Sequence, residues 1–398
     1  MRVLIVKMSA LGDIIHSLPV AARLKRLIPG LELDWLVEPL GLPLLQDNPA
    51  VDKVFVFEKK KWWQQLRSVS GLPATAGEFS AFVGKLRSRN YDAAIDLQGL
   101  LKSSLLAYFS GAPVRFGFKG TREGAEHLLT HRLDVGDYFG NTEHVVDLNL
   151  RLADYAASTL LKLVSEKLGI EGSAGAEKPP YSEGAAKPED LINLPVQDPI
   201  YMDEAGLFPL PETRADELAE LQSKLGSSFV PQLQNLVFIP GTTWETKIWP
   251  TEKWIELGRK CAESGWRIIL VGGPAEQLMN ERIATGIGAA QTVNLTGSTS
   301  IRQLIALFRE VRFVVGADTG PLHLAAAVPG CRVLGVFGST PMRRNGPYGS
   351  TNRGINLNLD CQPCFEKKCP LGTIACLRDL QAIQVYQAFS ELASSAQS

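Results

Sequence analysis

The sequence lacks an excess of charge, long hydrophobic runs and an abundance of histidine. Its 398 residues carry 41 Lys and Arg against 42 Asp and Glu, for a formal net charge of -1, so no overall field draws it to nucleic acid or to a membrane. No stretch comes close to the ~18 consecutive apolar residues of a membrane-spanning helix, and the apolar run before Lys7 is too short for a signal peptide. We therefore expect a soluble, cytoplasmic protein that does not bind nucleic acid.

Four well-known catalytic motifs are also missing. The sequence contains no G-x-G-x-x-G, no G-x-x-x-x-G-K-[ST], no H-E-x-x-H and no G-x-S-x-G. These absences argue against a dinucleotide dehydrogenase, a P-loop kinase, a zincin metalloprotease and an α/β-hydrolase.

Apolar runs of strand length alternate with helical patterns in two separate series. The first series begins with a strand at 2–6 and a helix over 14–27, and the second with a strand at 235–239 and a helix near 251–264. The stretch 171–215 between them loses this periodicity and is rich in Pro, Gly, Ala and Glu. The predicted parts are an N-terminal domain over 1–165, a linker or insertion over 166–230, a C-terminal domain over 231–377 and a C-terminal helix over 378–398.

This alternation predicts an α/β fold of two Rossmann-like, doubly wound domains. The two domains are expected to face a central cleft, because ligands of such sheets bind beyond the carboxyl ends of the strands. The C-terminal helix could pack back on the N-terminal domain. The search for a site is therefore confined to turns that lead from a strand into a helix.

The strongest of these turns is "FVVGADTGPLHLAAAVPG", residues 313–330. A buried strand ends there and turns through Asp318, Thr319 and Gly320 into a helix with Pro321 in its first turn. Amides at the positive end of that helix suit a diphosphate, and Gly320 allows a close approach. His323 could donate to a phosphate or a ribose oxygen, or could instead be a capping or packing histidine.

Two further turns in the same half carry polar groups. "FIPGTTWETKIWP", residues 238–250, offers the hydroxyls of Thr242 and Thr243 and the ammonium of Lys247, which suit phosphate oxygens, although an ordinary polar loop is the alternative. "LVGGPAEQ" places Glu276 where a carboxylate could bind the ribose of a nucleotide.

The first strand leads into "IVKMSALGDIIHSLPV", residues 5–20, which holds a single carboxylate, Asp13, at the start of a helix. Asp13 is either a helix cap or a base that takes the proton of an acceptor hydroxyl. Ser9 and Gly12 are small and leave this turn open to a ligand, which favours the base.

Four of the six cysteines lie within 16 residues, in "CQPCFEKKCPLGTIAC". Their C-x2-C-x4-C-x6-C spacing could hold a structural zinc ion or an iron–sulfur cluster, and free or disulfide-linked thiols are the alternative. The residues concerned are Cys361, Cys364, Cys369 and Cys376.

With these residues in view, the sequence resembles the ADP-heptose:lipopolysaccharide heptosyltransferases, most closely the type-I enzymes that place the first heptose on the inner core. The matching pieces are "VLIVKMSALGDIIHSLP", "YDAAIDLQGLLKSS", "GTTWETKIWP" and "FVVGADTGPLHLAAA", in the same order along both halves. The resemblance implies a glycosyltransferase of the GT-B type, an ADP-heptose donor, a lipid-A-bearing Kdo acceptor, inversion at the anomeric carbon and no catalytic metal. The cysteine segment and the long insertion depart from the type-I pattern.

The resemblance also assigns roles. Asp13 is implied as general base, and Glu276 as the carboxylate that binds the ribose. The implied contacts to the diphosphate and the rest of ADP are Thr242, Thr243, Lys247, Asp318, Thr319, Gly320 and His323.

An acceptor that bears Kdo and lipid A phosphates is anionic, so basic residues are expected near it. "VFEKKKWWQQLR" sets Lys60 and Lys61 beside Trp62 and Trp63, as suits a glycolipid at a membrane surface, and a solvated loop is the alternative. Ser9, Gly12, Lys60, Lys61 and Arg122 are the predicted acceptor residues. The protein is then expected to work peripherally at the inner face of the inner membrane.

Three other functions stay open from the sequence. The enzyme could add a second heptose to a heptose already on the core, or could be a nucleotide-sugar 2-epimerase on the same twin-domain fold. A non-catalytic protein that binds a nucleotide sugar is the third. No feature of the sequence predicts the oligomeric state.

Overall fold

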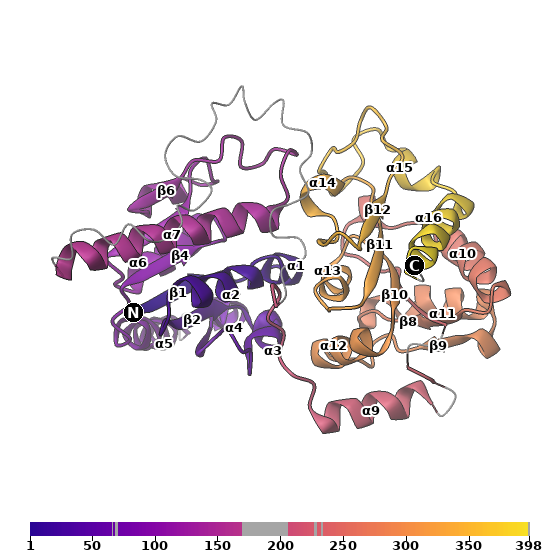
Figure 1. Ribbon diagram of the computed structural model, residues 1–398, viewed down its shortest axis with the longest axis horizontal. Coiled ribbons are helices and arrows are strands. Elements are labelled where there is room, and N and C mark those ends of the chain that lie inside the picture. Colours follow the sequence, from indigo (N-terminus) through magenta and orange to yellow (C-terminus); the bar gives the residue numbers. More distant parts are fainter. Residues whose placement is uncertain (66, 68–70, 169–205, 227–228, 232–233, 397–398) are drawn as a thin grey trace. The chain divides into compact units, whose positions relative to one another are not determined.

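The computed structural model describes residues 1–65, 67, 71–168, 206–226, 229–231 and 234–396. The chain forms two units, one of Met1–Gly140 with Val145–Pro209 and the other of Asn141–His144 with Leu210–Ser398. The described residues of each unit contain one six-stranded sheet whose strands are all parallel (Figure 1). The predicted α/β class with two Rossmann-like domains is therefore confirmed. The central cleft between the two domains stays a prediction.

Unit 1 has its strands in the order β3-β2-β1-β4-β5-β6. Its helix α6 packs on β1 and β4, and α7 packs on β5 and on α2. The strands are β1 (Arg2–Val6), β2 (Glu32–Val37), β3 (Lys53–Val56), β4 (Ala93–Asp96), β5 (Val114–Phe118) and β6 (His131–Leu133). The helices are α1 (Leu11–Ile15), α2 (Leu18–Leu27), η1 (Pro39–Gly41), α3 (Leu42–Leu45), α4 (Lys59–Gln65), α5 (Gly71–Arg87), α6 (Leu101–Phe109), η2 (Ala125–Leu128) and α7 (Val145–Leu168).

Unit 2 has its strands in the order β12-β11-β10-β7-β8-β9. The strands are β7 (Asn235–Ile239), β8 (Arg267–Leu270), β9 (Thr292–Asn294), β10 (Phe313–Ala317), β11 (Arg332–Val336) and β12 (Arg353–Ile355). The helices are α9 (Ala215–Leu225), η3 (Glu245–Lys247), α10 (Thr251–Glu263), η4 (Pro274–Glu276), α11 (Gln277–Ile287), η5 (Ala289–Gln291), α12 (Ile301–Glu310), α13 (Gly320–Ala326), α14 (Met342–Asn345), α15 (Ala375–Arg378) and α16 (Ala382–Ser394).

The two units share one topology. Counted within its own unit, each sheet has the order 3-2-1-4-5-6, in which the chain direction across the sheet reverses between the first and the fourth strand. In unit 1 these strands are β1 and β4, and in unit 2 they are β7 and β10. Ligands of doubly wound sheets bind beyond the carboxyl ends of the strands at this reversal. The turns that the sequence singled out after β1, β7 and β10 therefore stand where this fold places its sites.

The helix predicted over 14–27 is broken into two. Helix α1 ends at Ile15 and α2 begins at Leu18, with Ser17 as the residue before α2 and Pro19 in its first turn. Proline is well placed in a first turn, where its missing amide wastes no hydrogen bond. The side-chain amide of Asn149 donates to the backbone oxygen of His16 at 3.0 Å and so satisfies a carbonyl at the break.

The boundaries between the predicted parts also differ. Helix α9 lies inside the range 166–230 that the sequence assigned to a linker, yet it belongs to unit 2 and packs against α12. An ion pair of 2.7 Å between Glu217 and Arg302 joins the two helices. The rest of that predicted linker lies largely outside the described residues.

The expectation that the C-terminal helix packs back on the N-terminal domain is wrong. Helix α16 lies against α10, β11 and β12 of unit 2 (Figure 1). Val385, Phe389 and Leu392 recur at helical spacing on one side of α16 and are buried in the core of unit 2. The ring of Phe389 lies 5.2 Å from that of Trp266, centre to centre. This apolar stripe covers the second sheet, which explains the placement.

Replacing Phe389 by Ala should lower the free energy of unfolding by about 3 to 5 kcal/mol, because the change opens a cavity in the core of unit 2. Chemical denaturation with urea measures it. Ile383→Ala on the same helix, where the side chain is 41% exposed, should change the stability by no more than about 0.5 kcal/mol. Equal losses in both variants would show that α16 is not part of this core.

Candidate active site

The turn after β1 presents Asp13 to solvent on the first turn of α1. One carboxylate oxygen, Oδ2, accepts a hydrogen bond from the amide of Ala10 at 3.0 Å, and the side chain is exposed. Ser9 and Gly12, the small residues predicted to leave this turn open, are half-buried beside it. Asp13 therefore caps α1 through one oxygen while its carboxylate stays accessible, so the capping and the catalytic interpretations are compatible.

The neighbouring turn after β4 holds this turn in place. The side-chain oxygen of Gln98 accepts from the amides of Met8 at 3.1 Å and Ser9 at 3.2 Å. From the other side, the buried ammonium of Lys7 donates to the backbone oxygen of Leu97 at 2.8 Å. Two of the pieces that carried the family resemblance, one at 3–19 and the other at 91–104, are thus bonded to each other in the fold.

Asp96, the last residue of β4, anchors that second turn. Its buried carboxylate accepts from the hydroxyls of Ser104 at 2.6 Å and Ser103 at 3.0 Å, and from the amides of Gln98 and Gly99. Burial raises the pKa of Asp96 above its ordinary value, although these hydrogen bonds work in the opposite direction. Sequence reasoning quoted this motif without assigning a role to Asp96. The signal was an Asp at a strand end, followed by Gly and then by two adjacent serines.

In unit 2, three polar side chains from different turns converge on Asp318. Its Oδ2 lies 2.7 Å from the Nζ of Lys247 and accepts from the hydroxyl of Thr340 at 2.6 Å. Its Oδ1 lies 3.0 Å from the Nε2 of His323. These partners follow β7, β11 and β10, so the sheet brings together two predicted cationic or donor residues, Lys247 and His323. Thr340 was missed, since only the tertiary structure brings it here.

The electrostatics of this cluster keep Asp318 ionised. Burial alone raises the pKa of its carboxyl, but the hydrogen bond with His323 and the positive charge of Lys247 outweigh burial and hold that pKa well below its usual range. Asp318 is therefore an anion turned inward, toward its own partners. Its contacts hold Lys247 and His323 in place, and its predicted place among the donor-binding residues stays a prediction.

The loop that carries Lys247 is packed through Trp244. The Lys247 Nζ lies 4.5 Å from the centre of the Trp244 ring, which adds a cation–π attraction to the ion pair. In the same loop, Thr243 is exposed and the Thr242 hydroxyl donates to the backbone oxygen of Asp318 at 3.3 Å. Two predicted residues of this loop, Thr242 and Lys247, thus contact Asp318.

Helix α13 begins directly after Asp318. Thr319 precedes it with an extended backbone, Gly320 is its first residue and Pro321 occupies its first turn, as the sequence predicted. The first amides of a helix have no partner within the helix and are available to an acceptor. Thr319 and Gly320 are half-buried.

Glu276 lies over the backbone of two strand-end turns. A Cβ added to Gly241, in the turn after β7, would stand 2.1 Å from the Cγ of Glu276. A Cβ added to Gly273, in the turn after β8, would stand 3.0 Å from its Oε2. Glycine at these positions lets the carboxylate approach the backbone, so Glu276 borders the same edge of the sheet as Lys247.

His144 adds a side chain that sequence reasoning did not find. The segment Asn141–His144 belongs to unit 2, although the residues on both sides of it belong to unit 1. The Nε2 of His144 donates to the backbone oxygen of Gly346 at 3.0 Å, and its ring packs 4.8 Å from that of Tyr348, centre to centre. Burial lowers the pKa of His144 to about 4, with smaller contributions from His323 and Arg344 in the same direction.

Comparison with known proteins identifies one family over most of the chain. The sequence profile described as glycosyltransferase family 9 (heptosyltransferase) matches residues 79–192 and 203–375. The chain belongs to glycosyltransferase family 9. The resemblance stated from its motifs and the assignment as a glycosyltransferase are thereby confirmed.

Individual members of family 9 match the chain nearly end to end. Lipopolysaccharide heptosyltransferase 1 of Pseudomonas aeruginosa is 29% identical over 374 residues, 93% of this chain and 87% of the relative. The protein of the same name from Escherichia coli K12 is 30% identical over 376 residues, 92% of this chain and 99% of the relative. A solved structure of the E. coli heptosyltransferase WaaC with ADP superposes with a TM-score of 0.68 at 26% identity, covering 98% and 100% of the two chains.

In this family 9 chain, the basic residues predicted for the acceptor are exposed. Lys60 and Lys61 lie on α4, where the Nζ of Lys61 is 2.9 Å from Glu78. Trp63 is 66% exposed, but Trp62 is buried and its ring packs 4.9 Å from that of Phe57. The expectation that both tryptophans face a membrane is therefore wrong for Trp62. Its side chain is part of the aromatic core beneath α4 and α5.

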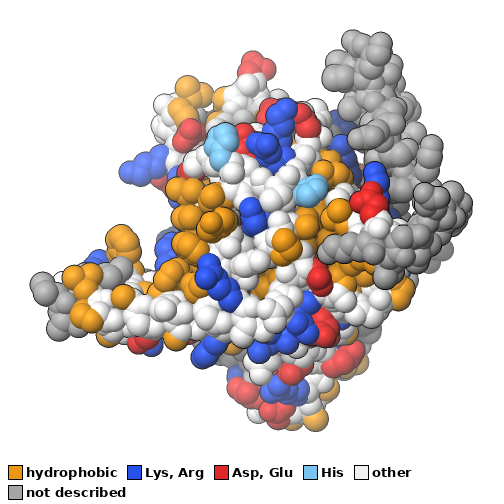
Figure 2. Space-filling model, turned by 90° about the vertical axis from the view of Figure 1, so that its left-hand side faces the viewer, with side chains coloured by type: hydrophobic (Ala, Val, Ile, Leu, Met, Phe, Trp, Pro, Cys, Tyr) orange, Lys and Arg blue, Asp and Glu red, His pale blue; other side chains and the backbone are white. Residues whose placement is uncertain are grey.

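Arg122, the remaining basic residue predicted for the acceptor, is also exposed. Its guanidinium lies 4.6 Å from the centre of the Phe139 ring, which is 44% exposed. Figure 2 shows Lys and Arg side chains at several separate places on one face of the molecule, mixed with acidic and hydrophobic side chains. The expected positive charge is thus local, as the near-zero net charge requires.

The four clustered cysteines all lie in the described part of the chain. Cys361 is exposed, Cys364 and Cys369 are half-buried, and Cys376 is buried, all as free thiols. Within the described ranges, no three His, Cys, Asp or Glu side chains are placed so that they could hold a metal ion as they stand.

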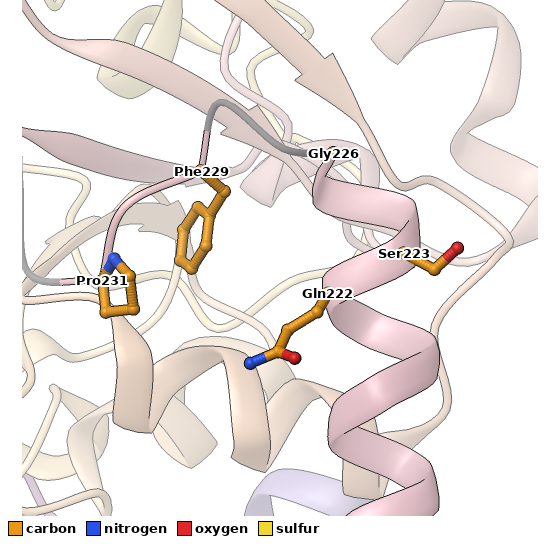
Figure 3. Close-up of a pocket in the computed structure, with 5 residues that line it drawn as sticks. All are labelled: Gln222, Ser223, Gly226, Phe229 and Pro231. Atoms are coloured by element: carbon orange, nitrogen blue, oxygen red, sulfur yellow. The ribbon is translucent and has the colours of Figure 1, made fainter.

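One surface cavity lies apart from all of these residues. It encloses about 280 Å³ between the end of α9 and the chain leading to β7, and is lined by Gln222, Ser223, Gly226, Phe229 and Pro231. Gln222 points toward Phe229 and Pro231, whereas Ser223 points away (Figure 3). Its lining carries no group that could act as an acid, a base or a cation, so the candidate site of this family 9 protein lies at the strand ends.

No helix in the described ranges combines the length and the apolar character needed to cross a bilayer.

Between pH 7 and pH 5 the protein should lose up to about 2 kcal/mol of stability through His144. The folded protein keeps His144 neutral down to a pKa of about 4, whereas the unfolded chain takes up a proton near the ordinary value of 6.5. The contribution is therefore complete above pH 6.5 and is lost as the pH falls toward 4. Urea denaturation at both pH values measures it.

His144→Gln should remove this part of the pH dependence, since Gln does not titrate and can still donate to Gly346. His127→Gln, at an exposed histidine of unit 1, is the matched control and should leave the pH dependence as it is. An unchanged pH profile in His144→Gln would contradict the assignment to His144.

Proposed function

We propose that this protein transfers heptose from ADP-heptose to the Kdo-containing inner core of lipopolysaccharide, with inversion at the anomeric carbon. The observation that carries the proposal is the convergence of Lys247 and His323 on buried Asp318, at the strand reversal where unit 2 would bind a nucleotide. It is supported by relatives named lipopolysaccharide heptosyltransferase 1 at about 30% identity, and by the similar structure of a heptosyltransferase with ADP.

The donor diphosphate would be held by Lys247, His323 and the first amides of α13. An ammonium group has three N–H donors, so Lys247 can keep its bond to Asp318 and still donate to phosphate oxygens. The hydroxyls of Thr242 and Thr243 would add further donors from the same loop. Glu276, at the neighbouring strand end, would accept hydrogen bonds from the ribose hydroxyls.

Asp13 would act as the general base. Its accessible carboxylate takes the proton of the acceptor hydroxyl, while the oxygen of that hydroxyl forms a bond to the anomeric carbon. The bond from that carbon to the diphosphate oxygen breaks on the opposite face, and ADP leaves with the electron pair. Attack from the opposite face inverts the configuration. Transfer therefore requires the acceptor at Asp13 in unit 1 to reach the donor bound by unit 2.

The charge that builds up on the leaving ADP would be stabilised by protein groups in place of a catalytic metal. A cation and helix amides fixed before the reaction stabilise developing negative charge without rearranging, which is how such sites lower a barrier. The Asp318 ion pair and the Trp244 ring hold Lys247 in one position, as this mechanism requires.

The acceptor would be bound by unit 1. Ser9 and Gly12 would line the turn at Asp13, and Lys60, Lys61 and Arg122 would attract the anionic groups of Kdo and lipid A. Exposed Trp63 beside Lys60 suits the interface of a bilayer, so the protein would attach peripherally to the inner face of the inner membrane.

Asp13→Asn should lower kcat by about 100-fold to 10,000-fold, because Asn cannot take up the proton of the acceptor. Asn is as good a helix cap as Asp, so the fold of α1 should persist. The rate of transfer from ADP-heptose to a Kdo-bearing lipid A, followed by mass spectrometry of the product, measures the change. Binding of ADP, measured by calorimetry, should stay the same.

Glu58→Gln, at an exposed acid elsewhere in unit 1, is the matched control and should keep full activity. An Asp13→Asn variant with near-normal kcat would contradict the role of Asp13. Turnover of ADP-heptose without an acceptor would point to an epimerase, and a product formed only on cores that already carry heptose would point to addition of the second heptose.

Lys60→Glu should weaken binding to vesicles of phosphatidylethanolamine with phosphatidylglycerol. A lysine near an anionic surface contributes about 1 kcal/mol, so the charge reversal should lower the vesicle affinity by roughly tenfold, and added salt should shrink the difference. Vesicle co-sedimentation measures it. Lys162→Glu, an exposed lysine on α7, is the control for the change in net charge, and equal losses in both variants would contradict a specific role for α4.

A further inference from the structure

The cation of the Asp318 cluster is already paired within the protein. The Nζ of Lys247 lies 2.7 Å from the Oδ2 of Asp318, and the pKa of that carboxyl is held well below its usual range, so both groups are charged and their charges offset each other. Each phosphate group of an ADP-sugar is negative, and further negative charge builds up as ADP leaves. Lys247 can donate hydrogen bonds to it, but a balance of charge calls for another cation near the same loop.

The irregular segment between β12 and α15 brings a second lysine to this loop. Residues 356–374 contain neither helix nor strand, and irregular segments longer than about 12 to 15 residues are usually functional. In this segment, the Nζ of Lys367 lies 5.4 Å from the centre of the Trp244 ring, and the Nζ of Lys247 lies 4.5 Å from the centre of the same ring. The two ammonium groups are therefore no further apart than the sum of these two distances.

Hydrogen bonds and a ring contact fix this segment against the loop. The hydroxyl of Thr246 donates to the backbone oxygen of Glu366 at 2.6 Å, and the amide of Phe365 donates to the backbone oxygen of Ser339 at 2.8 Å. Phe365 has a φ of 56°, a left-handed conformation, and its ring packs 5.9 Å from that of Trp244, centre to centre. Such a conformation persists only where the surrounding structure requires it. The two residues directly before the second lysine are thus held beside the donor loop.

Unlike Lys247, Lys367 has no carboxylate partner within the ranges that the structure describes. Neither Glu366, beside it in the chain, nor Glu245, in the donor loop, forms an ion pair with it there. Its side chain is exposed and rests near the Trp244 ring, and a cation–π contact at an exposed site is weak compared with a hydrogen bond between two charged groups. The ammonium stands on a flexible stem, so it can leave the ring for a phosphate oxygen.

We propose that Lys367 is a second cation for the diphosphate of the donor, which binds phosphate oxygens beside Lys247 and stabilises ADP as it leaves. This inference rests on the proposed function. A lysine serves such a ligand as a point charge, and a charge within the Debye length of about 8 Å acts on it even before contact. Lys367 lies outside all four pieces that carried the family resemblance, in the segment that departs from the type-I pattern.

Lys367→Gln should weaken the binding of ADP to the full-length protein by about tenfold to a hundredfold, because it removes a hydrogen bond between charged groups. Calorimetry measures the affinity, and circular dichroism checks the fold. Lys368→Gln is the matched control, since that lysine is the next residue, is equally exposed and makes no contact with the Trp244 ring in the described part of the chain. It should bind ADP within about twofold of the wild type.

Two further measurements separate the charge of Lys367 from the packing of its stem. Lys367→Arg keeps the positive charge and should bind ADP several-fold more tightly than Lys367→Gln. Added salt should shrink the difference between the wild type and Lys367→Gln, because salt screens an exposed charge. An equal loss in the Arg variant, or a difference that salt leaves unchanged, would show that the stem acts by packing and would overturn the proposal.

The transfer reaction tests the part that Lys367 plays as ADP leaves. With ADP-heptose as donor, Lys367→Gln should lower kcat as well as raise KM, because the negative charge is greater in the transition state than in the bound donor. A higher KM with an unchanged kcat would overturn stabilisation of the leaving group.

The wild type separates the failure of this inference from a failure of the proposed function. If the wild type binds ADP and Lys367→Gln binds it equally well, the role of Lys367 is overturned and the proposed function stands. Equal losses in Lys367→Gln and Lys368→Gln would show a general effect of surface charge and would overturn that role too. A wild type that fails to bind ADP would count against the proposed function, and the role of Lys367 would fall with it.

Discussion

The arrangement of unit 2 depends on the buried negative charge of Asp318. A carboxylate taken out of water is stable only with a compensating cation and hydrogen bonds, and here Lys247, His323 and Thr340 supply them from three separate turns. Removing one partner from such a cluster costs about 3 to 5 kcal/mol, because the charge that remains is buried and unpaired. These bonds hold the turns after β7, β10 and β11 in fixed positions relative to one another. They also fix the position of the Lys247 ammonium, which could bind a phosphate.

Unit 1 has a buried carboxylate at the matching position with the opposite chemistry. Asp96 and Asp318 each stand at the end of the fourth strand of their sheet, beside the first strand. Asp96 has hydroxyl and amide partners, and burial raises its pKa, whereas Asp318 faces cations and its pKa is lowered. Among the described residues, the same fold therefore gives an anchor bonded by hydroxyls and amides in unit 1 and a cluster that contains a cation in unit 2. This difference in partners agrees with acceptor and donor roles for the two units.

The strand-end turns could be predicted because they depend on local patterns. The start of α13 was marked by a buried strand, then a small residue, and then a proline in the first turn of a helix. Asp13 was singled out by a similar pattern, at the start of a helix that follows the first strand and small residues. The features that could not be predicted depend on contacts between residues that lie far apart in the sequence. Nothing local shows that Trp62 enters an aromatic core, that α16 covers the second sheet, or that His144 joins unit 2. The partners of Asp318 could not be predicted either, because a sequence shows the charge of a residue and not the direction it faces.

The position of Lys247 is set from two directions. On one side its ammonium meets Asp318, and on the other the adjacent Thr246 accepts from the hydroxyl of Ser339 at 2.9 Å and donates to Glu366. Ser339 is followed in the chain by Thr340, whose hydroxyl donates to Asp318. These hydrogen bonds, together with the chain that joins them, thus form a closed ring around the loop of Lys247. Because the Lys247 ammonium and the neighbouring Thr246 are both held in place, Lys247 loses little conformational freedom when an anion binds. The irregular segment that carries the cysteines is thus part of what orders the cation, although it lies more than a hundred residues along the chain.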